Sequence, residues 1–576
     1  MRFEMQNVEC RMQNEYKPQR RMRRYLAFII LHSSFCVLPA SLRAETPAVL
    51  PYGMAGVPSS PVQRINTTPP AAIDLLGLRV TGDYLPQRVQ TQTELGECEL
   101  PAGAKFIRQG MADADPQVRT AAAAAAGKVH DPSLLPDLKK LMADTDPRVR
   151  RQAVLSGAAI AAGDSAFVDA GLADADASVV AAAVSVAGAD RYDKIAKAIP
   201  AYPQPTRIVA LRTLARTGHD RYAAAAVSCL QGEISLRAAA VEALGQMKAK
   251  SASDSIVKLL ADEHPTVRRQ ALQALPNLLS EPDAQARYIA ALADAENSVR
   301  EAAARLLQQF PTADAITPLV ATLPTESARL NMAARDALVA AGPPAAVAIE
   351  KLLTDQNPRR REDASYVLGK LKSDVGLDQH IKLMSDPDWA VVKQAAMSLG
   401  AIGRKEAIPA VVAVANRVTL PEGGSVTDFA ASAPAVEQAI VAAGTLGDTS
   451  ILPMCHKILP EVKTVAAEFR AAAAYAIGRS QEPSERANAG SLAGRLRDDK
   501  EGYLVQFECV KALGHLRAPA GKAVVGADDD HSKFSSNAQS HWLCHWVRDR
   551  ISGEETPLPP YKENWQAQPS VMPLGY

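Results

Sequence analysis

The segment Asp113-Ala-Asp-Pro-Gln-Val-Arg119 decides the fold of this 576-residue chain, because the same pattern returns along the sequence. The next copy is Asp144-Thr-Asp-Pro-Arg-Val-Arg150, and Arg119 and Arg150 stand 31 positions apart. Further copies begin at Asp262 and Asp294, and more degenerate ones begin at Asp174, Asp355 and Asp386. A period of this length predicts a solenoid of stacked supersecondary units.

One unit shows what each repeat contains. Leu134, Leu138 and Leu141 recur at the spacing of one helix face. Asp146-Pro147 then opens a second helix, with aspartate as the N-cap and proline at the first position, where its missing N–H costs nothing. Each unit is therefore expected to hold two short antiparallel helices, whose apolar faces are buried only when units stack. We predict an all-α solenoid of tandem helix–turn–helix repeats over residues 101–516.

The Asp-x-Asp/Asn-Pro-x-Val-Arg turn leads into an alanine-rich helix, as in residues 118–127 and 267–275. In this combination the sequence resembles the HEAT-repeat family, particularly its short bacterial form, the HEAT-like or PBS-lyase-like repeat. The resemblance implies a structural ladder along the stack, carried here by Asp113, Arg119, Asp144, Arg150, Asp262, Arg268, Asp294 and Arg300. Val180 and Val392 occupy the arginine position in their units, so we expect the ladder to be broken there.

The composition narrows the choice of partner. The chain has 64 basic and 63 acidic residues and a net charge of +1, so it lacks the basic excess of a typical nucleic-acid-binding protein. We therefore expect no nucleic-acid partner. Its 7 cysteines include no C-x-x-C pair, which argues against zinc ribbons and thiol redox sites.

The N-terminus has the pattern of an export signal. Arg20-Arg-Met-Arg-Arg24 precedes the apolar segment Tyr25–Leu31, and small residues follow as far as Ala44. We predict a signal peptide over residues 1–44, with Met22 as the expected true start. After its cleavage no membrane span is expected. The protein should then be periplasmic or secreted, in a bacterial envelope.

Four segments flank or interrupt the predicted array. Residues 45–100 are interpreted as a proline-rich linker and a short N-terminal segment, with a pair of short strands within 73–100. An insertion at 417–434 leaves the stack, either as a contact element or as a tolerated surface loop. Residues 517–555 are expected to form a C-terminal capping helix region, and the proline-rich residues 556–576 an extended tail.

The sequence contains no recognisable catalytic constellation. It has no H-E-x-x-H and no G-x-S-x-G motif. It also has no His-Glu dipeptide, which is the iron-binding motif of the HEAT-type enzyme deoxyhypusine hydroxylase. We therefore predict no enzymatic activity and no cofactor.

Two clusters remain as candidate sites. His541, Cys544 and His545 are spaced i, i+3, i+4 on a helix and could hold a metal such as zinc, although a solvated outer face is the alternative reading. Arg359, Arg360 and Arg361 begin another helix. These arginines are either solvated surface residues, or their guanidinium groups form bidentate contacts with the carboxylates of a partner.

Three functions are compatible with these features. The favoured one is an exported scaffold that mediates protein–protein interaction by binding a protein or peptide on the concave face lined by the second helices. The alternatives are an accessory protein of an enzyme system, as among lyase-like HEAT proteins, and an envelope polysaccharide-binding protein. We expect the specific function where the repeat departs from itself: in residues 417–434, in residues 359–361 and in the tryptophan-bearing C-terminal region.

Overall fold

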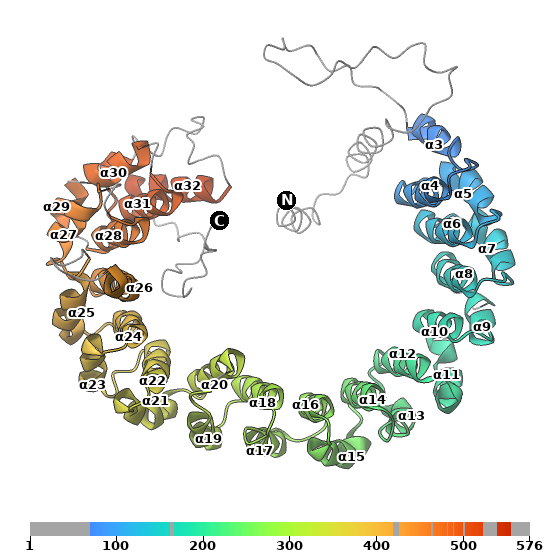
Figure 1. Cartoon of the computed structure of the whole chain (residues 1–576), viewed down its shortest axis with the longest axis horizontal. Coiled ribbons are helices and arrows are strands. Elements are labelled where there is room, and N and C mark those ends of the chain that lie inside the picture. The colour runs from blue at the N-terminus through green and yellow to red at the C-terminus, as the bar shows by residue number, and fades with distance from the viewer. Residues whose placement is uncertain are drawn as a thin grey trace, which may run out of the picture. The chain divides into compact units, whose positions relative to one another are not determined.

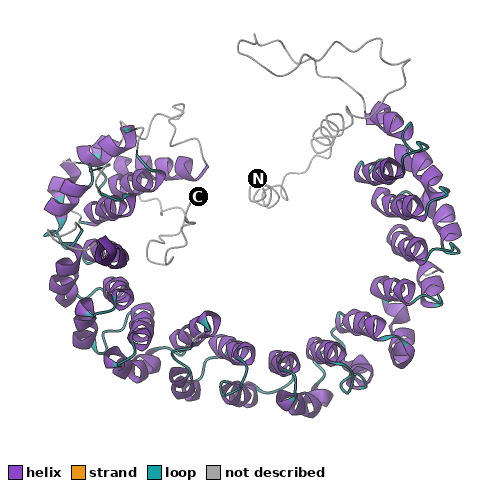
Figure 2. Ribbon diagram, viewed as in Figure 1, coloured by secondary structure: helices purple, strands orange, loops and turns teal. Residues whose placement is uncertain are grey.

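The computed structural model describes residues 69–161, 166–325, 327–418, 426–461, 465–480, 482–487, 489–498, 501–521 and 538–554. The predicted signal peptide, most of the linker and the tail lie outside these ranges. Every regular element within them is helical, with no strand (Figure 2). The predicted all-α solenoid is confirmed. None of the helices in this part of the chain combines the length and apolarity needed to cross a bilayer.

The first of two compact units extends to Leu259 (Figure 1). Its first-helix layer is α3 (Pro69–Gly77), α5 (Ala104–Met111), α7 (Leu135–Leu141), α9 (Ala166–Leu172), α11 (Tyr192–Ala198), α13 (Ala223–Val227) and α15 (Ser253–Lys258). Its second-helix layer is α4 (Leu85–Glu97), α6 (Pro116–Val129), α8 (Pro147–Ile160), α10 (Ala177–Val186), α12 (Gln204–Ala215) and α14 (Ile234–Gln246). Each second helix packs against the next one in its layer.

The second unit begins at Leu260 and has the same two layers. Its second helices are α16 (Pro265–Ala274), α18 (Asn297–Gln309), α20 (Ala328–Ala340), α22 (Pro358–Leu371), α24 (Trp389–Ile402), α26 (Val426–Thr445), α28 (Ala467–Arg479) and α31 (Tyr503–His515), followed by α32 (Ala538–Ser552). Its first helices are α17 (Glu281–Ala291), α19 (Ile316–Ala321), α21 (Pro343–Ile349), α23 (Leu377–Lys382), α25 (Ile408–Ala415), α27 (Leu452–Ile458), α29 (Pro483–Ala487) and α30 (Gly490–Arg497).

The second helices begin where their N-cap chemistry dictates. In α8, the side chain of Asp146 accepts a hydrogen bond from the backbone N–H of Arg148, and Pro147 fills the first helical position. Asp115 caps α6 in the same way. The start predicted for α8 from Asp146-Pro147 is therefore confirmed.

Glycine sets how closely neighbouring second helices approach. A Cβ on Gly478 of α28 would lie 2.5 Å from the Cα of Ala512 in α31, and a Cβ on Gly96 of α4 would lie 2.8 Å from the Cα of Ala125 in α6. Real Cβ atoms do not approach that closely, so these positions require glycine. Both glycines are the twelfth residue of their helix, which places the closest contact at the same level in both units.

The pair of strands predicted within residues 73–100 is wrong, because this segment forms α3 and α4. Ile73, Leu76 and Val80 are all buried. Ile73 and Leu76 have the i, i+3 spacing of one face of α3, whereas a half-buried strand would alternate. The first described helix, α3, therefore begins at Pro69, inside the region interpreted as linker and N-terminal segment.

Part of the predicted insertion at 417–434 is helical. Residues 426–434 form the first turns of α26, which continues to Thr445 with Pro434 inside it. The surrounding sequence is rich in alanine, a strong helix former, which favours a helix despite the proline. Residues 419–425 lie outside the described ranges.

The predicted C-terminal helix is α32, which packs on α31. The side chains of Leu543, Trp546 and Val547 are buried. A Cβ on Gly514 of α31 would meet the Trp546 indole at 2.2 Å, so that glycine makes room for the ring. The side chain of Trp542 is outside the described part of the structure.

Candidate interaction site

Arginine–aspartate pairs link successive repeats within each unit. In each pair, Nε and Nη2 of an arginine donate to the two carboxylate oxygens of the turn aspartate in the next repeat, at 2.6–3.3 Å. The pairs are Arg88–Asp113, Arg119–Asp144 and Arg150–Asp174 in the first unit, and Arg268–Asp294 and Arg361–Asp386 in the second. The bidentate geometry is that of a strong charge-assisted contact.

Each arginine also binds its own turn. Nη1 of Arg119 donates to the backbone carbonyl of Asp113 at 2.9 Å. The turn aspartate has a second role as well, because Oδ1 of Asp144 accepts the backbone N–H of Asp146 at 2.9 Å. Hydrogen bonds from Arg150 hold the pKa of the Asp174 carboxyl below its usual value. These residues thus stabilise the stack. Because their N–H groups and carboxylate oxygens are largely hydrogen-bonded within the chain, few of them are available to bind a ligand.

Asp262 and Arg300, which were also predicted as ladder residues, make contacts within their own turns. Asp262 accepts the backbone N–H of His264 at 2.9 Å. Arg300 donates to the carbonyl of Asp294 at 2.7 Å and to the side-chain oxygen of Asn297. The turn that follows α19 lacks the Asp-x-Asp pattern. Val180 and Val392, where breaks were expected, are buried apolar residues.

The arginine run 359–361 is not a free cationic surface. Arg361 forms the pair with Asp386, and Arg360 donates from Nε to the Leu323 carbonyl at 3.1 Å and from Nη1 to Asp355 at 3.2 Å. Arg359 is the most exposed residue of the run. Several N–H groups of Arg360 and Arg361 thus already bind acceptors within the chain, which disfavours their use as guanidinium forks for a partner.

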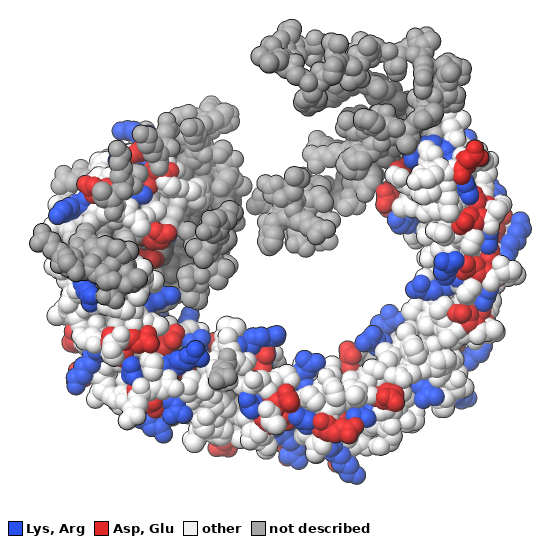
Figure 3. Space-filling view, viewed as in Figure 1, with Lys and Arg blue, Asp and Glu red and all other residues white. Residues whose placement is uncertain are grey.

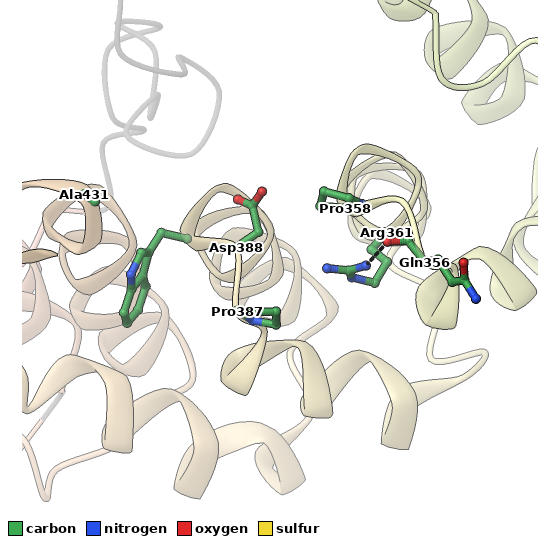
Figure 4. Close-up of a pocket in the computed structure, with 7 residues that line it drawn as sticks. Gln356, Pro358, Arg361, Pro387, Asp388 and Ala431 are labelled. Carbon is green, nitrogen blue, oxygen red and sulfur yellow. Dashed lines mark hydrogen bonds between the residues drawn. The ribbon is translucent and has the colours of Figure 1, made fainter.

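A groove of about 540 Å³ lies beside Arg361, between the N-terminal turns of α22 and α24. Figure 4 shows Pro358 and Arg361 on the α22 side and Pro387 and Asp388 on the α24 side. We call it the Trp389 groove; its lining residues are Gln356, Pro358, Arg361, Pro387, Asp388, Trp389 and Ala431.

The groove lies at a turn that departs from the repeat. In the turn Asp386-Pro387-Asp388-Trp389, the proline precedes the N-cap Asp388, and Trp389 takes the first helical position, which is proline in α22. The Arg417 guanidinium lies 4.5 Å from the centroid of the indole, in a cation–π contact. The indole remains partly exposed.

Two of the predicted departures from the repeat meet at this groove. Arg361 belongs to the arginine run, whereas Arg417 and Ala431 belong to the predicted insertion at 417–434. The sequence predicted both segments separately as functional regions, but it did not identify Trp389 as a site residue. The sequence feature that could have indicated Trp389 is the position of the proline in Asp386-Pro387-Asp388. In the regular Asp-x-Asp/Asn-Pro turn the proline follows the second Asp or Asn, whereas here it precedes it.

A buried carboxylate lies between α20 and α22. Asp363 is 1% exposed and accepts a hydrogen bond from the amide of Asn331 at 2.8 Å, with Arg335 at 3.4 Å. Burial raises its pKa to about 6. The Arg335 guanidinium lies 4.4 Å from the centroid of the Tyr366 ring. Asn331 is the fourth residue of its helix, the position that arginine takes in α22.

The metal candidates His541, Cys544 and His545 all lie on α32. Cys544 is buried, and burial raises the pKa of its thiol to about 11, which disfavours the thiolate that a metal requires. His545 is exposed, and the side chain of His541 is outside the described residues. Among described residues no group of three potential ligands is found.

A serine–histidine pair occurs in the second unit but is inaccessible. Ser365 Oγ lies 2.8 Å from Nε2 of His380, and both residues are 0% exposed. Burial lowers the pKa of His380 to about 4. A nucleophile must reach its substrate, so this pair serves to link α22 to α23.

Taken together, the layers of paired helices and the pairs that fasten them define an α-solenoid of helical repeats. The sequence model for HEAT repeats matches residues 104–189, 192–276 and 345–419. These three segments consist of HEAT repeats, as their turns suggest.

Solved structures of similar fold include two with Kap95. A chain of the structure in which Kap95p binds RanGDP aligns with 85% of this chain and 70% of its own length, with a TM-score of 0.50 and 15% identity. A chain of the Kap95:Nup1 complex aligns over 84% and 73%, with a TM-score of 0.54 and 14% identity. These likenesses concern the fold. The chain matches none of the curated proteins.

Proposed function

We propose that this chain is an exported scaffold that binds a protein or peptide partner at the Trp389 groove. The family and the fold support a protein-interaction scaffold in general. The two Kap95 structures are complexes with another protein. Figure 3 shows acidic and basic side chains interspersed on the face in view, so we assign recognition to a local site.

The observation that carries the proposal is the partly exposed Trp389 held by Arg417. A proline at the first helical position would start α24 equally well, as Pro358 does in α22. The stack therefore does not require an indole there. Tryptophan and arginine are enriched among the residues that contribute most to binding, so this position is well suited to a partner.

Partner capture tests this assignment. The exported full chain and its Trp389→Ala variant would be compared with Tyr503→Ala, a matched control that removes the aromatic ring at the same helical position of α31. We expect a protein recovered with the unmodified chain and with Tyr503→Ala, but depleted at least tenfold with Trp389→Ala. Identical recovery from all three would contradict the assignment of the groove.

Export is proposed from the residues before Ala44. We expect the mature protein in the periplasm or the medium, with an N-terminus at Glu45. Replacing Ile29 and Ile30 by aspartate should retain the full-length chain in the cytosol, because the apolar segment of a signal is its essential part. Cell fractionation with N-terminal sequencing gives the answer, and an uncleaved chain in the cytosol without substitution would contradict export.

A further inference from the structure

We infer that the Trp389 groove takes an extended, proline-rich peptide that carries one lysine or arginine. The inference rests on the proposed function, since it names the chemistry of the partner at the same site. It is argued from the spacing of the turns, from the lining of the groove and from the state of its charged groups.

The general spacing of packed helices is close to the repeat of a polyproline II peptide. Such a peptide has three residues per turn and rises about 3.1 Å per residue, so equivalent side chains recur every ~9.3 Å. Packed helices lie about 8–10 Å apart. The groove is lined from α22, α24 and α26, which are successive members of one layer. A ligand with proline at every third residue can therefore place one proline ring against each successive helix of the layer.

The lining suits proline rings. Pro358 and Pro387 offer apolar surface without an N–H group, and the Trp389 indole adds a flat aromatic face. Aromatic-lined grooves bind polyproline segments well, because the ligand is already extended and loses little conformational entropy. Ala431 adds only a methyl group, which leaves space at the α26 side.

The Arg361 guanidinium is already satisfied. Its Nε and Nη2 bind the Asp386 carboxylate, and its Nη1 donates to the carbonyls of Asp355 and Gln356 at 2.8 and 3.1 Å. An anionic ligand would have to break these bonds, so the groove does not favour a phosphate or carboxylate group.

The other charged group of the lining favours a cation. Oδ1 of Asp388 accepts the backbone N–H of Ala390 at 2.8 Å, and within the described ranges no cation forms an ion pair with this carboxylate. Its second oxygen can accept from a lysine or arginine of the peptide. The negative charge of Asp388 is therefore the reason that we infer a basic residue in the peptide.

Fluorescence anisotropy with a labelled decapeptide tests the inference. The probe has proline at every third position and one arginine before the first proline; one comparator replaces the arginine by alanine, and another places the prolines consecutively. With the full chain we expect saturable micromolar binding of the probe and at least threefold weaker binding of each comparator. Equal binding of all three peptides, or no binding, would overturn the inference.

Two variants and a control locate the binding. Trp389→Ala should weaken the probe at least tenfold, while Tyr503→Ala should leave it unchanged. Asp388→Asn keeps the N-cap, because asparagine caps as well as aspartate. It should therefore abolish the preference for arginine over alanine without affecting the fold. Retention of that preference in Asp388→Asn would overturn the assigned role of the carboxylate.

The C-terminal segment of the chain is a rival occupant, because Pro557-Leu-Pro-Pro-Tyr-Lys562 has similar chemistry. Replacing Pro557, Pro559 and Pro560 by alanine in the full chain should leave probe affinity within twofold. A tenfold gain would identify the tail as the occupant and overturn an external partner. Partner capture that still depends on Trp389, without any peptide binding, would refute the ligand class and leave the proposed scaffold function standing.

Discussion

Arg361, which lines the Trp389 groove, donates hydrogen bonds from Nε and Nη2 to both carboxylate oxygens of Asp386, at 2.6 and 2.7 Å. The same contact fastens α22 to the turn that begins α24. The pair is mostly excluded from water, with side chains 12% and 5% exposed. The groove is therefore built on a structural contact, and its shape depends on the stability of the stack.

Arg361→Ala should destabilise the second unit by about 2–4 kcal/mol, because it leaves the buried Asp386 carboxylate without its cation. In a repeat array the effect should be local, so hydrogen exchange should show lost protection in α22 and α24 first. Arg359→Ala, in the same run but with an exposed side chain, should change stability by less than about 0.5 kcal/mol. Equal effects of the two variants would contradict the assigned role of Arg361.

Gly478→Ala should destabilise the second unit by about 1–3 kcal/mol, because its Cβ would meet the backbone of α31. Gly494→Ala is the matched control in α30, where a Cβ meets nothing within 4 Å. That variant should stabilise by about 0.5–1 kcal/mol, the helix preference of alanine over glycine. Urea denaturation of the full chain measures both. Stabilisation by Gly478→Ala would show that the helices have room to separate.

Asp363 should make the second unit more stable in mild acid. Its pKa is raised from 3.8 in the unfolded chain to about 6 in the folded one, so the folded state binds the proton more tightly. The resulting stability, at most about 3 kcal/mol, is fully present below pH ~4 and is lost as pH rises through about 6. The groups around the carboxyl are Asn331, Arg335, Glu362 and Arg359.

Asp363→Asn should remove this contribution, whereas Asp378→Asn, at an exposed position of α23, should leave the pH profile unchanged. Urea midpoints between pH 4.5 and 7.5 provide the measurement. A profile of Asp363→Asn that is parallel to that of the unmodified chain would contradict the titration of this group.

The parts of the fold that depend on local chemistry could be predicted from the sequence. The N-cap Asp146 and the proline after it act within one turn, so the start of α8 could be predicted from the sequence. The direction of the Arg–Asp pairs could not be predicted from the sequence. A constant period is equally compatible with contacts within one repeat and with contacts between neighbouring repeats. Only the stacked helices show that Arg119 reaches forward to Asp144.

The candidate site depends on packing and was for that reason harder to predict. Trp389, Arg417 and Ala431 are separated in sequence and meet only because α24, α25 and α26 stack. The arginine run looked like a ligand site because its acceptors, the Leu323 carbonyl and Asp386, lie in neighbouring repeats. The strands predicted within 73–100 failed because short apolar runs do not distinguish a strand from a buried helix.

Site-specific photo-crosslinking in cells tests most directly whether the Trp389 groove binds a partner. A photoreactive amino acid would replace the exposed Ala390, beside the groove, or Val347 of α21, which is 66% exposed in the other layer. A discrete cross-linked product is expected from position 390, absent from position 347 and lost when Trp389→Ala is added. No product from position 390, or the same products from both positions, would contradict a binding site at this groove.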